Sequence, residues 1–400
     1  MRRQTGAPAE RSQFRTDARM PTPGVGAAGS PDLHGGKIRE AAAVQGVDPH
    51  EFLDYSANVN FLGPTPAVLA AARRAIDETA WYPVDPPCHL ARAAAAFFDV
   101  DEESVLLGNG ASELIFLVVA SLRPRRVLVV GPTFTEYERA ALAWGAEVDV
   151  LPLPAERDFH FTAADLDDLG AAALVARADL LFYCDPNNPT GALLEREARA
   201  YLLDLAEAAG TAVFADESFL AFTAAWPAGS VLRDRRPNVI VLHSLTKILA
   251  MPGLRLGALI VPPVFRVDLR RRLTPWNINC VAHAAGHAAL AEVDMLESTP
   301  GAVAAAREEF VAGLAVLPGV ERVLPADANF VCLRLAAPRA REVVRRLREE
   351  HGVLLRDLTD FPGLDGRYLR SAVRAPEDNR LVLRALAAVL GDGDQAGGAR

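Results

Sequence analysis

Residues 244–247 read SLTK and are followed by PGLRLG at residues 252–257, and Lys247 in this stretch is the most informative residue of the chain. A lysine amine loses its charge readily when it is desolvated, and the neutral amine can form a Schiff base with an aldehyde. Lys247 follows the apolar run 239–242, which is typical of a buried strand. Arg255, eight positions later, can hold a phosphate through two parallel hydrogen bonds. Together these groups suit pyridoxal 5'-phosphate, an aldehyde cofactor with a phosphate group, although a surface lysine with an unrelated arginine fits SLTK alone equally well.

Composition and charge narrow the class of protein. The chain has 400 residues, half of them apolar, which is enough for one large domain and a smaller one. A formal net charge of -9 argues against nucleic acid as the main partner, and the absence of any run of about 18 apolar residues argues against a membrane span. The cysteines at positions 88, 184, 280 and 332 form no CxxC pair, and the histidines lack the ligand spacing of a zinc site. We therefore expect a cytoplasmic protein with reduced, mostly buried thiols and no metal.

Strand and helix patterns alternate between two polar ends. Residues 1–33 and 391–400 are rich in glycine and lack periodicity, and we expect both to be flexible tails. Short apolar runs at 127–130, 180–183, 212–215 and 239–242 predict strands, and residues 198–209 predict one of the intervening helices. This alternation indicates a mostly parallel α/β sheet. After about residue 295, Arg/Glu-bearing helices and short strands such as 330–335 predict a smaller α+β domain.

A motif of small residues precedes an apolar helix at residues 114–122. Residues 108–113 read GNGASE, and small residues at a helix start leave backbone N–H groups free to bind an anion. An ordinary helix capped by Ser112 or Asn109 fits the same letters. The motif differs from the dinucleotide-binding pattern, which needs glycine where this chain has Glu113. It therefore predicts either a phosphate site or a plain helix N-terminus.

Further candidate residues follow other predicted strands. DPNNPTG at 185–191 is a rigid loop that projects an amide from a strand end, where open α/β sheets bind ligands. Asp216 follows the strand at 212–215, and a buried carboxylate there needs a partner such as a protonated pyridine nitrogen; a helix cap is the alternative. Phe134, in PTFTEYE at 132–138, either stacks on a cofactor ring or belongs to the core. Tyr82, before a proline, is equally ambiguous.

Taken in order, GNGASE, PTFTEYE, DPNNPTG, ADESF and SLTK with PGLRLG resemble the fold-type I pyridoxal-phosphate enzymes of the aminotransferase superfamily. The resemblance implies a large cofactor-binding domain at residues 81–295 with a mostly parallel seven-stranded sheet. It implies a small α+β domain at residues 296–390, and a segment at residues 34–80 that contributes to the small domain and the active site.

The same resemblance implies roles for individual residues. Lys247 would be the Schiff-base lysine and Asp216 the partner of the pyridinium. Asn188 would hydrogen-bond the phenolic oxygen of the cofactor, and Phe134 would stack on its ring. Tyr82 would reach a phosphate across a homodimer. The cofactor's phosphate would be held by Gly110, Ala111, Ser112, Ser244 and Arg255, with Thr246 also at the cofactor.

The two ends of the chain resemble threonine-phosphate decarboxylase, an enzyme family of the cobalamin pathway. HGGKIRE at 34–40, DYSANVN at 54–60 and the segment 356–374 carry this likeness. It implies a phosphorylated amino acid as substrate, and cationic and amide side chains suit the anionic groups of such a molecule. The implied substrate-binding residues are His34, Gly35, Asn58, Asn188, Arg356 and Arg370. Departures from the usual patterns at Lys37, Asp185, Phe219 and Leu358 leave room for a homologue with a different phosphorylated or acidic substrate.

Two reactions and one non-catalytic alternative follow from these motifs. The first is decarboxylation of L-threonine O-3-phosphate to (R)-1-aminopropan-2-ol O-phosphate and carbon dioxide. The second is transamination of the histidinol-phosphate type. The bond on the substrate's α-carbon that stands perpendicular to the cofactor ring is the one that breaks, so the anchoring residues choose between the two. A non-catalytic module on this fold would lack Lys247 or Asp216, and both are present.

Overall fold

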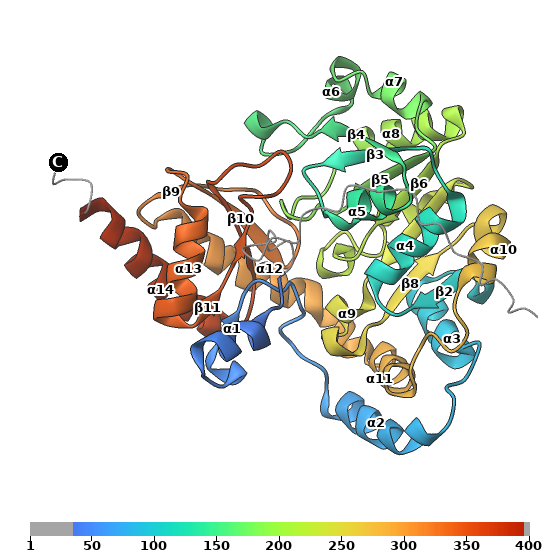
Figure 1. Cartoon of the computed structure of the whole chain (residues 1–400), viewed down its shortest axis with the longest axis horizontal. Helices are drawn as coiled ribbons and strands as arrows, with labels where there is room; N and C mark the ends of the chain where they lie inside the picture. The colour runs from blue at the N-terminus through green and yellow to red at the C-terminus, as the bar shows by residue number, and fades with distance from the viewer. Residues whose placement is uncertain (1–34, 396–400) are drawn as a thin grey trace, which may run out of the picture. The chain divides into compact units, whose positions relative to one another are not determined.

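A computed structural model describes residues 35–395 of the chain (Figure 1). The expectations for residues 1–33, His34 and residues 396–400 lie outside this part. A seven-stranded sheet dominates it, in the order β2-β8-β7-β6-β5-β3-β4. Its strands are β2 (Val105–Gly108), β3 (Arg126–Gly131), β4 (Glu147–Pro152), β5 (Leu180–Cys184), β6 (Ala212–Asp216), β7 (Val239–His243) and β8 (Gly257–Ile260). Only the pairs that β8 makes with β2 and β7 are antiparallel, so the predicted mostly parallel seven-stranded sheet is confirmed.

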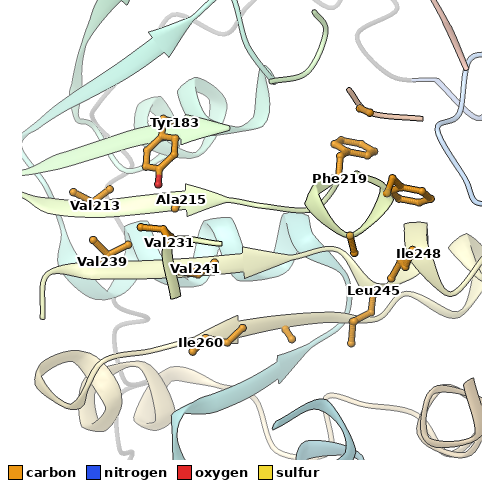
Figure 2. Packing of buried hydrophobic residues seen from close by; sticks show 14 of the residues in the cluster. Tyr183, Val213, Ala215, Phe219, Val231, Val239, Val241, Leu245, Ile248 and Ile260 are labelled. Carbon is orange, nitrogen blue, oxygen red and sulfur yellow. The ribbon is translucent and has the colours of Figure 1, made fainter. Parts of the chain in front are cut away.

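Both faces of this sheet are covered by helices, which explains why its central strands are apolar throughout. In β6, Val213 and Ala215 face one core cluster, whereas Ala212 and Phe214 face the other. Figure 2 shows the first of these clusters. It packs against α3 (Cys88–Phe98), α6 (Ala163–Asp168), α7 (Ala171–Ala176), α8 (Arg196–Ala209) and α11 (Cys280–Leu290). The second cluster packs against α4 (Ala111–Leu122), α5 (Glu136–Ala143) and α10 (Pro263–Arg272).

A second, four-stranded antiparallel sheet forms most of the C-terminal region, in the order β12-β13-β10-β9. Its strands are β9 (Val320–Val323), β10 (Phe330–Leu335), β12 (Arg356–Asp357) and β13 (Tyr368–Ala372). The helices α12 (Val293–Ala315), α13 (Ala340–His351) and α14 (Pro376–Gln395) share a core with it. Each helix contributes buried side chains to that core, such as Phe310 from α12, Val343 from α13 and Leu386 from α14.

The N-terminal segment contributes to both the smaller C-terminal region and the region of the large sheet. β1 (Leu53–Asp54) pairs in parallel with β11 (Val353–Leu354), and α1 (Ile38–Gln45) packs on this pair through Ala42 (Figure 1). The next helix, α2 (Pro66–Ile76), packs instead against α11. The chain therefore completes the smaller region with residues that are about 300 positions apart.

Two expected boundaries fall inside helices. The expected domain boundary between residues 295 and 296 lies within α12, which runs continuously past Pro300. The expected start of a C-terminal tail at residue 391 is also wrong, because α14 continues to Gln395. Glycine weakens a helix by about 1 kcal/mol but keeps its N–H donor, and the buried Val389 and Leu390 anchor the turn before Gly391.

Two findings bear on the class of protein. Within residues 35–395, no helix is both long enough and apolar enough to cross a membrane. All four cysteines are free thiols. Cys184 and Cys332 are buried, whereas Cys88 and Cys280 are only partly so, which corrects the expectation that most of them would be buried.

Candidate active site

A cavity of about 540 Å³ lies where the parallel strands of the large sheet end, and it collects most of the residues predicted from the sequence. Its lining includes Gly35, Asn58, Ala111, Ser112, Phe134, Asn188, Asp216, Ser244, Thr246, Lys247, Arg255, Arg356 and Arg370. Lys247 lies on α9 (Leu245–Ile248), directly after β7, and Asp216 is the last residue of β6. Asn188 follows β5 and Phe134 follows β3. The carboxyl ends of parallel strands meet at one edge of a sheet, so side chains far apart in sequence converge there.

The amine of Lys247 is less basic than an ordinary lysine. Burial lowers its pKa to about 8, and the positive charges of Arg370 and Arg255 contribute to the decrease. The backbone of Lys247 is hydrogen-bonded at both of its polar groups. Its N–H donates to the carbonyl of Ser244 at 3.0 Å, and its carbonyl accepts from the N–H groups of Asn60 at 3.0 Å and Ala250 at 3.2 Å. The neighbouring Leu245 and Ile248 anchor α9 in the core (Figure 2). A neutral amine on a fixed backbone is the form that attacks an aldehyde.

Asp216 is a buried carboxylate whose two oxygens are both hydrogen-bonded. Oδ1 accepts the backbone N–H of Ser218 at 2.9 Å, a local bond of the kind that the capping alternative predicts. Oδ2 accepts the hydroxyl of Tyr137 at 2.6 Å. Burial raises the pKa of Asp216, and the hydrogen bonds from Ser218 and Tyr137 oppose the rise. A carboxylate that accepts these hydrogen bonds can remain charged beside a cation in the cavity.

The N-terminus of α4 has the properties of an anion site. Neither Ser112 nor Asn109 caps the helix: its cap residue is Gly110, with φ of +90°, and no side chain bonds the cap. The plain capped helix that GNGASE also allowed is therefore wrong. A Cβ atom built on Gly110 would lie 2.4 Å from Nη2 of Arg255, so the guanidinium lies directly against the helix start. The hydroxyls of Ser244 and Thr246, 2.8 Å apart, line the same cavity. Backbone N–H groups, hydroxyls and an arginine together suit a phosphate.

Two buried arginines lie on the other side of the cavity. Arg356 on β12 and Arg370 on β13 are direct partners in the antiparallel pairing of these strands. Nη1 of Arg370 donates to Oδ1 of Asn188, and its Nη2 donates to the carbonyl of Ser56 at 2.6 Å. Burial and the charge of Arg356 lower the pKa of Arg370 to about 9. Because the carbonyl of Asn188 is occupied by Arg370, its amide NH₂ group is the end that can donate to a ligand.

The N-terminal segment supplies the last predicted contacts. Asn58 is buried in the cavity wall, and its Oδ1 has no hydrogen-bond partner among residues 35–391. Gly35 approaches the chain so closely that a Cβ atom there would lie 2.1 Å from the carbonyl oxygen of Ser56. The N–H of Gly36 donates to Oγ of Ser56 at 2.8 Å. His34, which the resemblance places at the substrate, lies outside the described residues.

Tyr82, which was also predicted for the site, does not line this cavity. Its side chain is 81% exposed and its ring lies 4.6 Å from that of Trp276. Sequence reasoning in turn missed Tyr137, whose hydroxyl bonds Asp216, and Phe361, whose ring lies under the guanidinium of Arg356 at 5.4 Å. A usable signal for Tyr137 was its place beside Phe134 in the same motif, PTFTEYE at 132–138.

The fold and this donor set define a pyridoxal-phosphate enzyme, and comparison with known proteins gives its family. The chain belongs to the aminotransferase class I and II family, whose profile matches residues 51–389. It is 37% identical to threonine-phosphate decarboxylase of Salmonella typhimurium, over 89% of this chain and 96% of the relative. It is 34% identical to histidinol-phosphate aminotransferase of Symbiobacterium thermophilum, over 86% and 92%. The structure of L-threonine-O-3-phosphate decarboxylase from Porphyromonas gingivalis matches with a TM-score of 0.72 and 27% identity, covering 84% of this chain and 99% of that one.

The motif-based resemblance is therefore confirmed at the level of family, fold and cofactor. Pyridoxal 5'-phosphate is the cofactor of this family, and this chain is an enzyme that depends on it. The cavity fits that molecule in three respects. It offers a lysine of lowered pKa for the aldehyde, a buried carboxylate for the ring nitrogen, and a helix start with an arginine for the phosphate.

Proposed function

We propose that this enzyme decarboxylates L-threonine O-3-phosphate to (R)-1-aminopropan-2-ol O-phosphate and carbon dioxide. The observation that carries the proposal is the pair Arg356 and Arg370, two buried cations that line the same cavity as Lys247. A phosphorylated amino acid has two anionic groups, and a guanidinium can hold either one through two hydrogen bonds. The 37% identity to a threonine-phosphate decarboxylase over most of both chains supports this substrate.

Within this proposal each cavity residue has a task. Lys247 holds the cofactor aldehyde, Asp216 pairs with the pyridine nitrogen, and Asn188 donates its amide to the phenolic oxygen. Phe134, which lines the cavity, packs over the ring. The phosphate is held by Gly110, Ala111, Ser112, Ser244 and Arg255, with Thr246 beside them. When bound, the cofactor supplies a ring that accepts electrons from the α-carbon of the substrate.

The substrate residues then determine the product. Arg356, Arg370, Asn58, Asn188 and, by resemblance, His34 and Gly35 would hold the amino acid and orient the bond to its carboxylate for cleavage. Once carbon dioxide has left, the amine of Lys247, or a water, returns a proton to the α-carbon. The lowered pKa of Lys247 suits this task, because a group that takes and returns protons works best with a pKa near the working pH.

A second candidate is an aminotransferase of the histidinol-phosphate type, and the 34% identity to such an enzyme favours it. A related possibility is a homologue recruited to another phosphorylated or acidic amino acid. Phe219 weighs towards the decarboxylase. It lines the cavity and has no hydroxyl, whereas aminotransferases often place there a tyrosine that contacts the phenolic oxygen of the cofactor.

We also propose that the enzyme is a cytoplasmic homodimer in which Tyr82 reaches the cofactor phosphate of the partner subunit. The exposure of Tyr82 supports this, as does that of Trp81, Val84 and Trp276, whose side chains are 71%, 54% and 48% exposed. Exposed apolar side chains gathered in one patch are typical of a surface that another chain covers. The free thiols agree with a reducing compartment.

Product analysis with two substrates in parallel tests the proposal. The purified holoenzyme is incubated with L-threonine O-3-phosphate alone, and separately with histidinol phosphate and 2-oxoglutarate. We expect carbon dioxide and an amino-alcohol phosphate from the first mixture and no keto acid. Formation of a keto acid in stoichiometric amount, or turnover of histidinol phosphate with conversion of 2-oxoglutarate to glutamate, would establish the aminotransferase instead.

A further inference from the structure

The hydroxyl of Tyr137, which bonds Asp216, has no task among the roles proposed above for the cavity residues. Tyr137 is fully buried on α5, and its hydroxyl donates to Oδ2 of Asp216 at 2.6 Å. Its ring stacks on Phe182, with centroids 5.0 Å apart and planes at 11°, and meets Phe134 edge to face at 5.6 Å. Because the packed core leaves the ring no room to turn, the hydroxyl is held against the carboxylate.

Few other groups help Asp216 to stay charged. Its own neighbour Glu217 is turned away, accepting from Oγ of Ser230 at 2.5 Å and from the N–H of Val231 at 2.7 Å. The remaining groups that act on the carboxylate are Ser218, through both its side chain and its backbone N–H, Cys184 on β5, His243 on β7 and Lys247 on α9. Burial raises the pKa of the Cys184 thiol well above its usual range, so the thiol is neutral. Tyr137 and Ser218 are thus neutral residues whose hydrogen bonds oppose the rise in the pKa of Asp216, and the bond from the Tyr137 hydroxyl is 2.6 Å long.

We propose that Tyr137 is a positioning residue that keeps the carboxylate of Asp216 ionised, so that the proton shared with a bound pyridine nitrogen stays on the nitrogen. The inference rests on the role proposed above for Asp216. A hydrogen bond to the charged form of a carboxylate makes it less basic, and removal of the donor makes it more basic. Without Tyr137 the proton therefore moves to Asp216, and a neutral pyridine is a weaker acceptor of electrons.

The position of this proton can be measured directly by nitrogen NMR of the holoenzyme loaded with cofactor that is ¹⁵N-labelled at the pyridine nitrogen. The wild type is expected to show the resonance of a protonated ring. In Tyr137→Phe the loss of one hydrogen bond to a charged group moves the proton equilibrium roughly tenfold or more towards Asp216. The resonance should therefore shift towards the value of a neutral pyridine.

Tyr183 provides a matched control. It is fully buried on the neighbouring strand β5, its hydroxyl has no hydrogen-bond partner within residues 35–391, and it belongs to the core cluster on the opposite face of the sheet (Figure 2). Tyr183→Phe removes the same atom from a comparable site, so its resonance should match the wild type. Incorporation of 3-fluorotyrosine at position 137 keeps the hydroxyl and should also retain the protonated resonance.

The outcomes separate this inference from the proposed function. An unchanged resonance in Tyr137→Phe would overturn the role of Tyr137 while leaving that of Asp216 intact. A neutral nitrogen in the wild type would instead refute the pairing of Asp216 with the ring. If Tyr137→Phe does not fold, the 3-fluorotyrosine protein decides, since its hydroxyl is the stronger donor. A shift towards neutral pyridine in that protein would contradict the inference, and a resonance at or beyond the wild-type protonated value supports it.

Discussion

Replacement of Gly110 by alanine should weaken cofactor binding without unfolding the protein. The backbone at Gly110 has φ of +90° and ψ of 166°, a region that is almost exclusive to glycine and costs other residues on the order of 1–3 kcal/mol. The added Cβ would lie 2.4 Å from Nη2 and 2.9 Å from Cζ of Arg255. Contacts this short cannot persist, and the arginine side chain is the more flexible partner. We therefore expect Arg255 to leave the helix start in Gly110→Ala.

The size of the effect follows from what Arg255 would hold. A hydrogen bond to a charged group contributes about 1.5–3 kcal/mol, and about 1.4 kcal/mol corresponds to a factor of ten in affinity. If one such bond to the cofactor phosphate is lost, the dissociation constant should rise roughly 10- to 100-fold. Fluorescence or absorbance titration of the apoenzyme with pyridoxal 5'-phosphate measures this change, and thermal unfolding of the apoenzyme measures the backbone cost separately.

Two further variants isolate the cause. Gly145 has φ of +77° and no atom within 4 Å of the place that a Cβ would take, so Gly145→Ala adds backbone strain without a clash and should bind the cofactor like the wild type. Arg255→Ala should weaken binding by itself but add little in the Gly110→Ala background, because the arginine is already displaced there. Fully additive effects of the two substitutions, or wild-type affinity in Gly110→Ala, would refute the reasoning.

Three more predictions follow from the buried groups. The rate at which Lys247 captures the cofactor aldehyde should rise with pH and level off above about pH 8, because the amine is neutral above its pKa. In Arg370→Gln the loss of a positive charge should raise the pKa of Lys247 and so move the midpoint of this pH profile upwards. Stopped-flow absorbance over a pH series would detect the change. Burial raises the pKa of Asp185 to about 6, although the positive charge of Arg199 opposes the rise. Arg199→Met should therefore lower the free energy of unfolding by about 3–5 kcal/mol at pH 7, and by less at pH 5, where the carboxyl of Asp185 is protonated. An equal loss at both pH values in urea denaturation would contradict this. Asn60→Ala leaves the buried carbonyl of Ile248 without its donor, and should destabilise the protein by about 1–3 kcal/mol in the same assay.

Much of the site could be predicted because its residues stand in local patterns. Lys247, Asp216 and Asn188 each follow an apolar strand, and strand ends of a parallel sheet meet at one edge. Gly110 was recognisable as part of a helix start, although the GNGASE motif did not show whether a side chain caps the helix. That question depended on rotamers, and the structure answered it by showing no cap.

The contacts that could not be predicted join residues far apart in the chain. The hydroxyl of Tyr137 meets Asp216 across 79 positions, and Arg370 meets Asn188 across 182. The parallel pairing of β1 with β11 spans an even longer separation, and two-residue strands carry almost no pattern of their own. Such contacts are decided by how the two sheets pack, and periodicity within one segment does not carry that information.

The residues proposed to hold the cofactor and those proposed to orient the substrate lie largely in different sheets. Lys247 and Asp216 follow strands of the seven-stranded sheet, whereas Arg356 and Arg370 lie on β12 and β13 of the smaller one. Substitutions in the smaller sheet could therefore alter how a substrate is held while Lys247 and Asp216 stay in place. The chain is 37% identical to a decarboxylase and 34% identical to an aminotransferase. The bond from Arg370 to Asn188 ties the two sheets together at the cavity, between residues proposed to contact the substrate and the cofactor.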